Sequence, residues 1–381
     1  MKIAFIPSTF LPYVGGAETQ THNVANCLIE KKVDVDIYVL KKEKIQNAKY
    51  NIIKLNHYLI SFIFILKYYF NINLDFLIKL YFKNIQNKKQ YDLWHFHSVN
   101  YKTLIYINVL NSLNQKVIVT FQGGDIQIDR KINYGYRLDK KYDTFLKTTL
   151  GKVNLFHAIS KSIKFELIKL GVSENKILII PNCSSSKKIE SIDKKNNSKN
   201  ITLLTIGRYA IKKKGFDLIE KISKSLNKIV DYKWIVVGRG TSSLLKEKYI
   251  QDNLNKFEII EEIKNHNENY FPHTDLINYY KESNVYVNLS RVEGCPIVLL
   301  DALSSKLPIV SFNTLGGDEI VIDNVNGFLV NENDFEVFVE KIIRSKNLDF
   351  KRNLTQIENK INYYDLELNT QKIISSYQGL L

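Results

Sequence analysis

Short runs rich in β-branched residues alternate with longer helical patterns along most of this chain, and that alternation limits the fold more than any other feature. The first series of strand-like runs lies at residues 2–6, 33–40, 93–97, 116–121, 155–160 and 176–180. A second series lies at residues 201–207, 234–238, 285–290 and 308–312. Continuous apolar strands separated by helices are typical of parallel sheets that are covered on both faces. The sequence therefore predicts an α/β protein with two doubly wound domains.

The stretch between the two series, PNCSSSKKIESIDKKNNSKN at residues 181–200, is rich in Ser, Lys and Asn and is typical of a linker. We predict one domain at residues 1–185, a linker at 186–200 and a second domain at 201–364. Two such domains on a linker would face a cleft, and ligands of open parallel sheets bind at the carboxyl ends of the strands.

The positive charge is concentrated in the first half of the chain. Residues 1–190 hold 28 Lys and Arg against 14 Asp and Glu, whereas residues 191–381 hold 26 against 25. A one-sided basic surface can attract nucleic acid, anionic lipid or phosphorylated substrates, although a general solubility bias gives the same pattern. Since the sequence has no recognisable nucleic-acid-binding module, we predict no nucleic-acid partner.

Two features indicate a cytoplasmic protein. The opening residues, MKIAFIPSTF, lack the apolar core and small-residue cleavage site of a signal peptide. Cys27, Cys183 and Cys295 have no paired spacing, which argues against disulfides and a zinc site.

Residues 56–83 form the most apolar helical pattern, with a narrow polar stripe that repeats every four residues. The charge-free run at residues 55–66 is 12 residues long, and a membrane span needs roughly 18. Such a helix either packs against a sheet or lies in a membrane interface, and packing is the commoner outcome.

The motif SRVEGCPIVLLDAL, at residues 290–303, places two carboxylates around an apolar run. Glu293 and Asp301 are eight positions apart, so a continuous helix would put them on one face about 12 Å apart. The free amides at the helix start would favour an anion, and Pro296 in the first turn would cost nothing. These amides lie near Cys295, Ile297 and Val298. The alternative is that Glu293 caps the helix and Asp301 is an exposed helix residue.

Two further loops follow predicted strands. Arg208 and Lys214 stand six positions apart, and both cations could converge on one diphosphate. Gly15 and Gly16 would let a backbone approach a ligand closely. Solvated cations and ordinary turn glycines would give the same patterns. Taken together, however, the two cations would bind a diphosphate and the two carboxylates would each bind a polyol. A nucleotide sugar is a ligand of this kind, because its diphosphate lies between a sugar and a ribose.

Two other pairs look like metal motifs. His95 and His97 share one strand face without a nearby carboxylate or Cys, so they are expected to line the cleft floor or to pack beneath it. Asp34 and Asp36 alternate with Val, which favours an exposed strand face. We predict no metal site.

Several fragments, taken in order, resemble the retaining GT-B glycosyltransferases of family 4, which carry an E-x7-E motif. They are GGAE at 15–18, YDLWHFHS at 91–98, VTFQGGD at 119–125, AISKSIKFELIKLGVSENKILIIPN at 158–182, IGRYAIKKKGFD at 206–217, VVGRG at 236–240, and the segment 290–330 from SRVEG to NGFLV. The resemblance implies two Rossmann-like domains that face a cleft, a C-terminal helix at 365–381 that packs back on the N-terminal domain, and hexosyltransferase activity without a metal or other cofactor.

The resemblance also implies roles for individual residues. Arg208 and Lys214 would hold the donor pyrophosphate and stabilise the leaving group, and Glu293 would bind the transferred sugar, which makes these three the catalytic residues. Asp301 would bind the ribose. The remaining donor-binding positions would be Gly16, Gly238, Gly294, Cys295, Pro296, Ile297 and Val298. Those that orient the acceptor or sugar would be Gly15, Gly16, Gln122 and Asp125. Retention in such enzymes proceeds by front-face attack.

Two positions depart from the family pattern. Asp301 stands where the family usually has Glu, and Gln122 where many relatives have His, so a general-base role at position 122 does not transfer. The expected function is transfer of a sugar from a nucleotide-diphosphate sugar to a glycan or polyprenyl-diphosphate-linked acceptor in cell-surface polysaccharide biosynthesis. The basic N-terminal domain would bind the anionic inner face of the cell membrane. The alternative is a catalytically silent relative that binds a nucleotide sugar or a protein partner.

Overall fold

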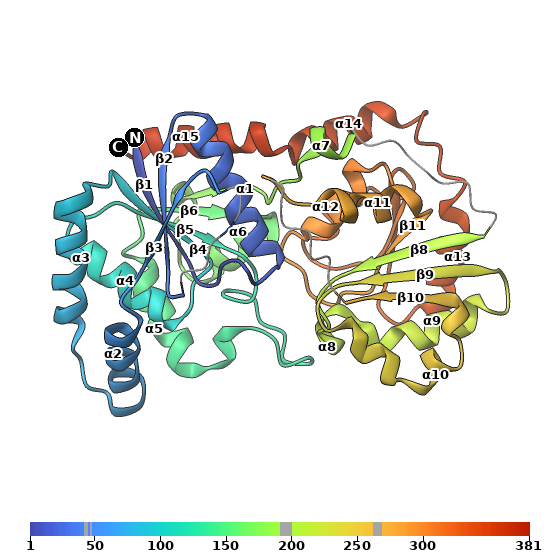
Figure 1. The fold of residues 1–381 in the computed structure, drawn as a ribbon, viewed down its shortest axis with the longest axis horizontal. Helices are drawn as coiled ribbons and strands as arrows, with labels where there is room; N and C mark the ends of the chain where they lie inside the picture. The colour runs from blue at the N-terminus through green and yellow to red at the C-terminus, as the bar shows by residue number, and fades with distance from the viewer. Residues whose placement is uncertain (42–44, 46–47, 191–199, 262–268) are drawn as a thin grey trace. The chain divides into compact units, whose positions relative to one another are not determined.

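The computed structural model describes residues 1–41, 45, 48–190, 200–261 and 269–381. The chain divides into two units, each built on its own parallel sheet (Figure 1). Unit 1 comprises residues 1–181 and 369–381, and unit 2 comprises residues 182–368. The prediction of two Rossmann-like α/β domains is confirmed.

The sheet of unit 1, within the described residues, has seven parallel strands in the order β3-β2-β1-β4-β5-β6-β7. The strands are β1 (Lys2–Pro7), β2 (Asp34–Val39), β3 (Asn51–Lys54), β4 (Leu93–His97), β5 (Val117–Phe121), β6 (Leu155–Ala158) and β7 (Ile177–Ile179). Every residue of β4 and β5 is buried. Because successive side chains point to opposite faces, complete burial means that both faces are covered.

The helices of unit 1 are α1 (Gly16–Glu30), α2 (His57–Phe70), α3 (Asp75–Lys89), α4 (Tyr101–Ser112), α5 (Lys140–Leu150) and α6 (Lys161–Lys169). The C-terminal helix α15 (Leu366–Leu380) packs on the same sheet. Its Tyr377 hydroxyl lies 2.6 Å from Nδ1 of His95 on β4, and its Ser376 hydroxyl lies 2.9 Å from Nε2 of His157 on β6.

The sheet of unit 2, within the described residues, has six parallel strands in the order β10-β9-β8-β11-β12-β13. The strands are β8 (Ile201–Ile206), β9 (Tyr232–Val237), β10 (Phe257–Ile260), β11 (Val285–Asn288), β12 (Ile309–Phe312) and β13 (Gly327–Val330). The helices are α7 (Ser186–Glu190), α8 (Ile211–Lys214), α9 (Ile219–Leu226), α10 (Lys248–Gln251), α11 (Thr274–Glu282), α12 (Ile297–Ser304), α13 (Phe335–Ser345) and α14 (Leu354–Tyr363).

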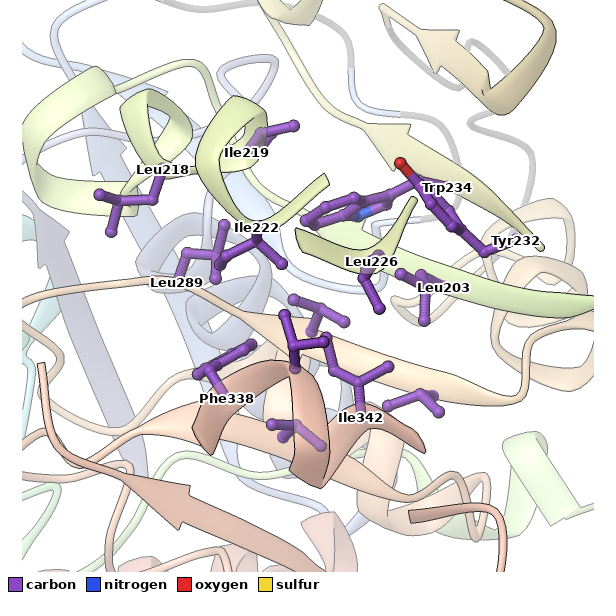
Figure 2. Close-up of a cluster of buried hydrophobic side chains, with 14 of the residues drawn as sticks. Leu203, Leu218, Ile219, Ile222, Leu226, Tyr232, Trp234, Leu289, Phe338 and Ile342 are labelled. Carbon is purple, nitrogen blue, oxygen red and sulfur yellow. The ribbon is translucent and has the colours of Figure 1, made fainter. Parts of the chain in front are cut away.

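The core of unit 2 shows how the helical pattern holds this sheet (Figure 2). Ile219, Ile222 and Leu226 lie at i, i+3 and i+7 of α9, so they share one face. That face packs, together with Phe338 and Ile342 of α13, over strand residues that include the fully buried Trp234. The apolar periodicity therefore fixes which face of each helix meets the sheet.

Three strands are missing from the sequence prediction, and all three lie at sheet edges. They are β3 in unit 1 and β10 and β13 in unit 2, each only four residues long. An edge strand has a neighbour on one side only, so β3 and β10 carry partly exposed residues in place of a continuous apolar run. In β13, Gly327 is needed because a Cβ there would lie 2.0 Å from the backbone oxygen of Ile309.

Three local expectations differ from the structure. Residues 56–83 form two helices, because Asn71 ends α2 in the left-handed conformation. Asp36 is buried and not on an exposed strand face, since the hydroxyl of Tyr91 and the amide of Asn51 donate to its carboxylate. Residues 186–190 of the predicted linker form α7 in unit 2, and residues 191–199 lie outside the described part of the chain.

Candidate active site

A buried ion pair joins two loops at the carboxyl edge of the unit 2 sheet. The Lys214 ammonium lies 2.5 Å from Oε1 of Glu293, and the two side chains are 17% and 7% exposed. Lys214 ends the short helix α8 after β8, and Glu293 lies in the loop between β11 and α12. Gly215 brings these loops together, because it has a φ of +68° and a Cβ there would lie 2.1 Å from the backbone oxygen of Leu289.

Several cations surround this pair and leave the site with an excess of positive charge. Burial opposes ionisation of Glu293, yet the charges of Lys214 and Lys213 hold the pKa of its carboxyl below the usual value. Burial also lowers the pKa of the Lys214 ammonium, and Lys213 and Arg208 add to this effect while Glu293 opposes it. Three cations, Arg208, Lys213 and Lys214, thus accompany one carboxylate. Such a group is suited to an anion that carries more than one negative charge.

Arg208 is the exposed member of this group. It lies in the loop after β8, where a Cβ at Gly238 would come within 2.1 Å of the backbone oxygen of Gly207 and 3.3 Å of the Arg208 amide. The glycine at position 238, with a φ of +148°, therefore permits close contact between the ends of β8 and β9. The structure brings Arg208, Lys214, Glu293 and Gly238 to one edge of the sheet.

Arg291 joins the loop of Lys214 to the loop of Glu293, a role that no sequence motif predicted. Its backbone amide donates to the Lys213 oxygen at 2.9 Å, and its guanidinium donates to the Lys212 oxygen at 2.7 Å. Two further guanidinium bonds of 2.9 and 3.1 Å reach the carboxylate of Asp217. A bidentate pair of this kind fixes geometry more firmly than a lysine would. We assign Arg291 a positioning role.

The helix that follows Glu293 starts later than predicted. Pro296 is the N-cap of α12, with a φ of −73° and ψ of 113°, so helical geometry begins at Ile297. Glu293 therefore lies in the preceding loop, and the expectation that it shares a helical face with Asp301 is wrong. No side chain caps the first turn, and the first amides of a helix have no partner within it. A role for the amides of Ile297 and Val298 in binding an anion stays a prediction.

The other residues of this loop are buried. Gly294 lies against Gly316, where a Cβ would come 2.2 Å from the Gly294 oxygen. The oxygen of Cys295 accepts a 3.0 Å hydrogen bond from the Asn182 side chain, and burial raises the pKa of the Cys295 thiol. A donor-binding role for Gly294, Cys295 and Pro296 would thus run through the backbone.

Asp301 lies inside unit 2 on α12 and is 3% exposed, so the alternative of an exposed helix residue is wrong. The Ser184 hydroxyl donates to its Oδ1 at 2.7 Å. Burial raises the pKa of the Asp301 carboxyl to about 7, although the bond from Ser184 and the charge of Lys188 partly oppose the rise. Ser184 and Lys188 come from the Ser- and Lys-rich stretch taken for the end of the first domain and a linker, which explains why sequence patterns missed them.

Replacing Asp301 with Asn is expected to stabilise unit 2 increasingly as the pH rises from 5 to 7. The folded wild-type protein holds a proton that the unfolded chain releases, so its stability falls with rising pH up to the folded pKa of about 7. The advantage of Asp301→Asn should grow by about 1.4 kcal/mol per pH unit. Denaturation followed by Trp234 fluorescence, in a Trp94→Phe background, measures it. The exposed Asp334→Asn is the control, and an advantage that does not change with pH would contradict the assignment.

Backbone amides of the loop after β9 donate hydrogen bonds to a carboxylate of the same unit. Glu261 accepts from the Gly240 amide at 2.6 Å and from the Ser242 amide at 2.8 Å. A hydrogen bond from the Ser242 side chain, together with these two, lowers the pKa of the Glu261 carboxyl. These two amides are therefore already satisfied by the chain itself.

The residues predicted to orient the acceptor lie in unit 1. A Cβ at Gly15 would come 2.6 Å from the carboxylate of Glu18, which also accepts from the Thr9 hydroxyl. Gly16 begins α1. The space beside Gly15 is thus used by the chain's own Glu18. Roles for Gly15 and Gly16 in binding a ligand stay predictions.

Asp125 organises the loop that holds Gln122. Its buried carboxylate accepts from the amides of Gln122 and Gly123 at about 3 Å, and from the Val99 amide at 3.1 Å. Burial raises the pKa of this carboxyl, although these bonds oppose the rise. Asp125 thereby fixes the position of Gln122, which is partly exposed. A direct role for either residue toward an acceptor stays a prediction.

His95 and His97 pack inside unit 1 with His157. The ring of His95 lies 4.1 Å from that of His97 and 5.0 Å from that of His157, measured between centroids. No group of three or more His, Cys, Asp or Glu residues in the described part of the chain is placed to hold a metal ion. The three imidazoles belong to the core.

The sequence matches two family models that adjoin each other. Residues 14–184 match Glycosyltransferase Family 4, and residues 186–362 match Glycosyl transferases group 1. The first match covers the strands of the unit 1 sheet except β1, and the second covers the strands of the unit 2 sheet. The chain belongs to these glycosyltransferases.

Three similar proteins illustrate the range of the family. An uncharacterised glycosyltransferase of Haemophilus influenzae is 30% identical over 65% of this chain and 66% of its own length. A capsular polysaccharide biosynthesis glycosyltransferase of Staphylococcus aureus is 28% identical over 55% of this chain and 58% of its own. The UDP-Gal:α-D-GlcNAc-diphosphoundecaprenol α-1,3-galactosyltransferase of Escherichia coli is 26% identical over 70% and 69%. Relatives of this chain thus include enzymes of polysaccharide biosynthesis.

Solved structures share the fold. A glycosyltransferase from Rickettsia africae superposes with a TM-score of 0.74 at 19% identity, over 100% of this chain and 98% of that one. An Anabaena protein in complex with UDP gives a TM-score of 0.72 at 14% identity, over 100% of both chains.

Proposed function

We propose that this glycosyltransferase moves a hexosyl group from a uridine-diphosphate sugar to a glycan or polyprenyl-diphosphate-linked glycan, with retention and without a metal ion. The observation that carries the proposal is the cation group at the Lys214–Glu293 pair. Lys214 and Lys213 act on the Glu293 carboxylate, and Lys213 and Arg208 act on the Lys214 ammonium. A diphosphate would balance the remaining positive charge. The same group would stabilise the negative charge that develops on the departing nucleoside diphosphate.

The donor would lie along the carboxyl edge of the unit 2 sheet. Arg208 and Lys214 would hold the diphosphate, with the amides at the start of α12 adding fixed positive dipoles. Glu293 would accept hydrogen bonds from sugar hydroxyls, since Lys214 keeps it ionised. Asp301 would serve the ribose through its oxygen that Ser184 does not use.

The choice of uridine and of a lipid-linked acceptor draws on similar proteins. The Anabaena structure contains UDP, and the Escherichia coli relative uses UDP-galactose and a diphosphoundecaprenol-linked sugar by its name. An acceptor of that kind would bring the enzyme to the inner face of the cell membrane, with Gly15, Gly16 and Gln122 near the acceptor. No helix in the described ranges combines the length and hydrophobicity needed to cross a bilayer.

A thermal-shift panel of nucleotide sugars, followed by assay of nucleotide release, tests the proposal. One UDP-sugar should raise the melting temperature; at 100 times its dissociation constant it stabilises by about 2.7 kcal/mol. Arg208→Ala should weaken that shift without lowering the stability of the free protein, because Arg208 is exposed. Arg352→Ala, an exposed cation elsewhere in unit 2, is the control.

Each finer part of the proposal has its own result. Turnover that persists in EDTA would support metal independence, and NMR of the product anomer would decide retention. A thermal shift without transfer to any acceptor would indicate the catalytically silent relative. No response to any nucleotide sugar would contradict the proposed donor site.

A further inference from the structure

Helix α2 is apolar on two opposite faces. Ile60 and Ile63 are 1% and 0% exposed and pack into unit 1. On the other side Tyr58, Phe62, Ile65 and Tyr69, at intervals of four, three and four residues, are 84, 57, 45 and 67% exposed. These intervals place the four side chains in one stripe along the helix. A helix that is apolar on both faces normally buries both of them. The outer stripe of α2 is instead exposed to solvent in this structure.

Polar contacts on the inner side fix the orientation of α2. Lys102 donates to the Ser61 hydroxyl at 3.1 Å, and Lys141 donates to the Tyr68 oxygen at 2.7 Å. The Tyr68 hydroxyl also donates to Asp139. These bonds tie α2 to the helices α4 and α5. The outer stripe therefore cannot turn inward without breaking them.

Helix α3 continues the exposed apolar surface and adds charge to it. Phe76 and Leu80 are 57% and 61% exposed, and the exposed Lys79 and Lys83 follow them at helical spacing. An ion pair between Lys67 and Asp75 links the two helices. Figure 1 shows α2 and α3 as separate helices at the periphery of unit 1. We call the exposed residues the α2–α3 face: Tyr58, Phe62, Ile65, Tyr69, Phe70, Ile72, Phe76 and Leu80.

The segment that carries this face, residues 54–90, is almost entirely positive in charge. Residues 54–90 contain six lysines and one acidic residue, Asp75, which is already paired with Lys67. The lysines are Lys54, Lys67, Lys79, Lys83, Lys88 and Lys89. Tyrosines and phenylalanines flanked by lysines are the composition of surfaces that enter the headgroup region of an anionic bilayer. Lysine stems can lie on the apolar layer while their ammonium groups reach the phosphates.

We infer that the α2–α3 face binds the surface of an anionic lipid bilayer, with its aromatic side chains in the interface and its lysines on the phosphates. The inference deepens the proposed function, and it rests on that function for the membrane-embedded acceptor. A second copy of the chain fits this face less well. A symmetric dimer would bring two copies of this lysine-rich face together, and the one carboxylate of residues 54–90, Asp75, is already paired with Lys67.

Vesicle sedimentation of the full chain tests the inference. Wild type should sediment with phosphatidylglycerol–phosphatidylcholine vesicles at low salt, and weakly with phosphatidylcholine alone. Phe62→Ser/Tyr69→Ser should lower the partition coefficient at least tenfold. Lys79→Gln/Lys83→Gln should lower it about fivefold per lysine on anionic vesicles, with little change on neutral ones. All four side chains are exposed, so folding should be preserved, and circular dichroism checks this.

The control is Ile229→Ser/Leu254→Ser, which removes two equally exposed apolar side chains from unit 2 and should leave binding unchanged. Failure of wild type to bind anionic vesicles would overturn the inference, as would variants that bind like wild type. Wild type that is dimeric by sedimentation velocity, and monomeric after Phe62→Ser/Tyr69→Ser, would overturn it in favour of a second copy.

These failures are distinguishable from failure of the proposed function. Phe62→Ser/Tyr69→Ser should retain the full thermal shift with the UDP-sugar, because the donor residues lie in unit 2. Transfer to a water-soluble acceptor should also persist in this variant. Loss of vesicle binding together with intact donor binding supports the α2–α3 face alone.

Discussion

Lys214→Met is expected to lower the transfer rate at least 100-fold and to destabilise unit 2 by about 3–5 kcal/mol. The first effect follows from the loss of a cation at the diphosphate. The second follows from the Glu293 carboxylate, which would remain buried without its partner at 2.5 Å. Steady-state kinetics measure the first, and denaturation followed by Trp234 in a Trp94→Phe background measures the second.

A double-mutant cycle separates these two effects. Glu293→Gln removes the unpaired charge, so Lys214→Met/Glu293→Gln should recover most of the stability lost in Lys214→Met. It should recover none of the activity, because the diphosphate cation and the sugar-binding carboxylate are then both absent. Equal recovery of activity and stability would contradict a direct role of the pair in transfer.

Lys212→Met is the matched control for this cycle. Lys212 lies two residues before Lys214 on the same short helix, is exposed, and pairs with Asp217 at 3.4 Å. Its contact with Arg291 uses only its backbone oxygen, which the substitution retains. Activity and stability should stay close to wild type, since exposed pairs contribute at most about 1 kcal/mol.

Central strands and the positions of the site loops could be predicted from sequence because burial on both faces leaves a continuous apolar run. The edge strands β3 and β10 could not, since their residues are partly exposed and resemble loops in composition. The Ser-rich stretch at 182–186 shows the converse. Its serine side chains donate hydrogen bonds to Asp301 and Asp365. These partners are distant in the sequence, so no local pattern predicts the contacts.

The residues of the candidate site could be named from the sequence, but the predicted geometry of Glu293 and Asp301 was wrong. The spacing of Glu293 and Asp301 was taken for two turns of one helix, but the extended backbone at Pro296 interrupts it. What brings Glu293 to Lys214 is the contact between Gly215 and Leu289 and the bonds of Arg291, all of which span distant parts of the sequence. A periodic pattern cannot report contacts of that kind.

The imidazole cluster of unit 1 should make that unit acid-labile. Burial, with mutual repulsion between the rings, lowers the pKa of His97 to about 3, and burial lowers that of His157 to about 3; the pKa of His95 is lowered as well. Below pH 6.5 the unfolded chain binds protons that the folded core refuses, so stability is lost as the pH falls. Each histidine lowers the free energy of unfolding by up to about 1.4 kcal/mol for each pH unit below 6.5, so the three together lower it by up to about 4 kcal/mol per pH unit.

In the window from pH 6.5 to 5 ordinary carboxylates remain largely ionised. The buried carboxyl of Asp125 has a raised pKa and acts in the opposite direction in unit 1, so the comparison with His97→Leu isolates the histidines. Trp94 is buried in the unit 1 sheet, so a Trp234→Phe background lets its fluorescence follow unit 1 alone. His97→Leu keeps an apolar side chain of similar size and should reduce the pH slope by about one third. Over the same window the stability of unit 2 should change in the opposite direction, because folded Asp301 holds a proton that the unfolded chain has already released. A slope in unit 1 that is flat, or that His97→Leu leaves unaltered, would show that the cluster takes up protons without unfolding and would remove the physical basis of the assignment.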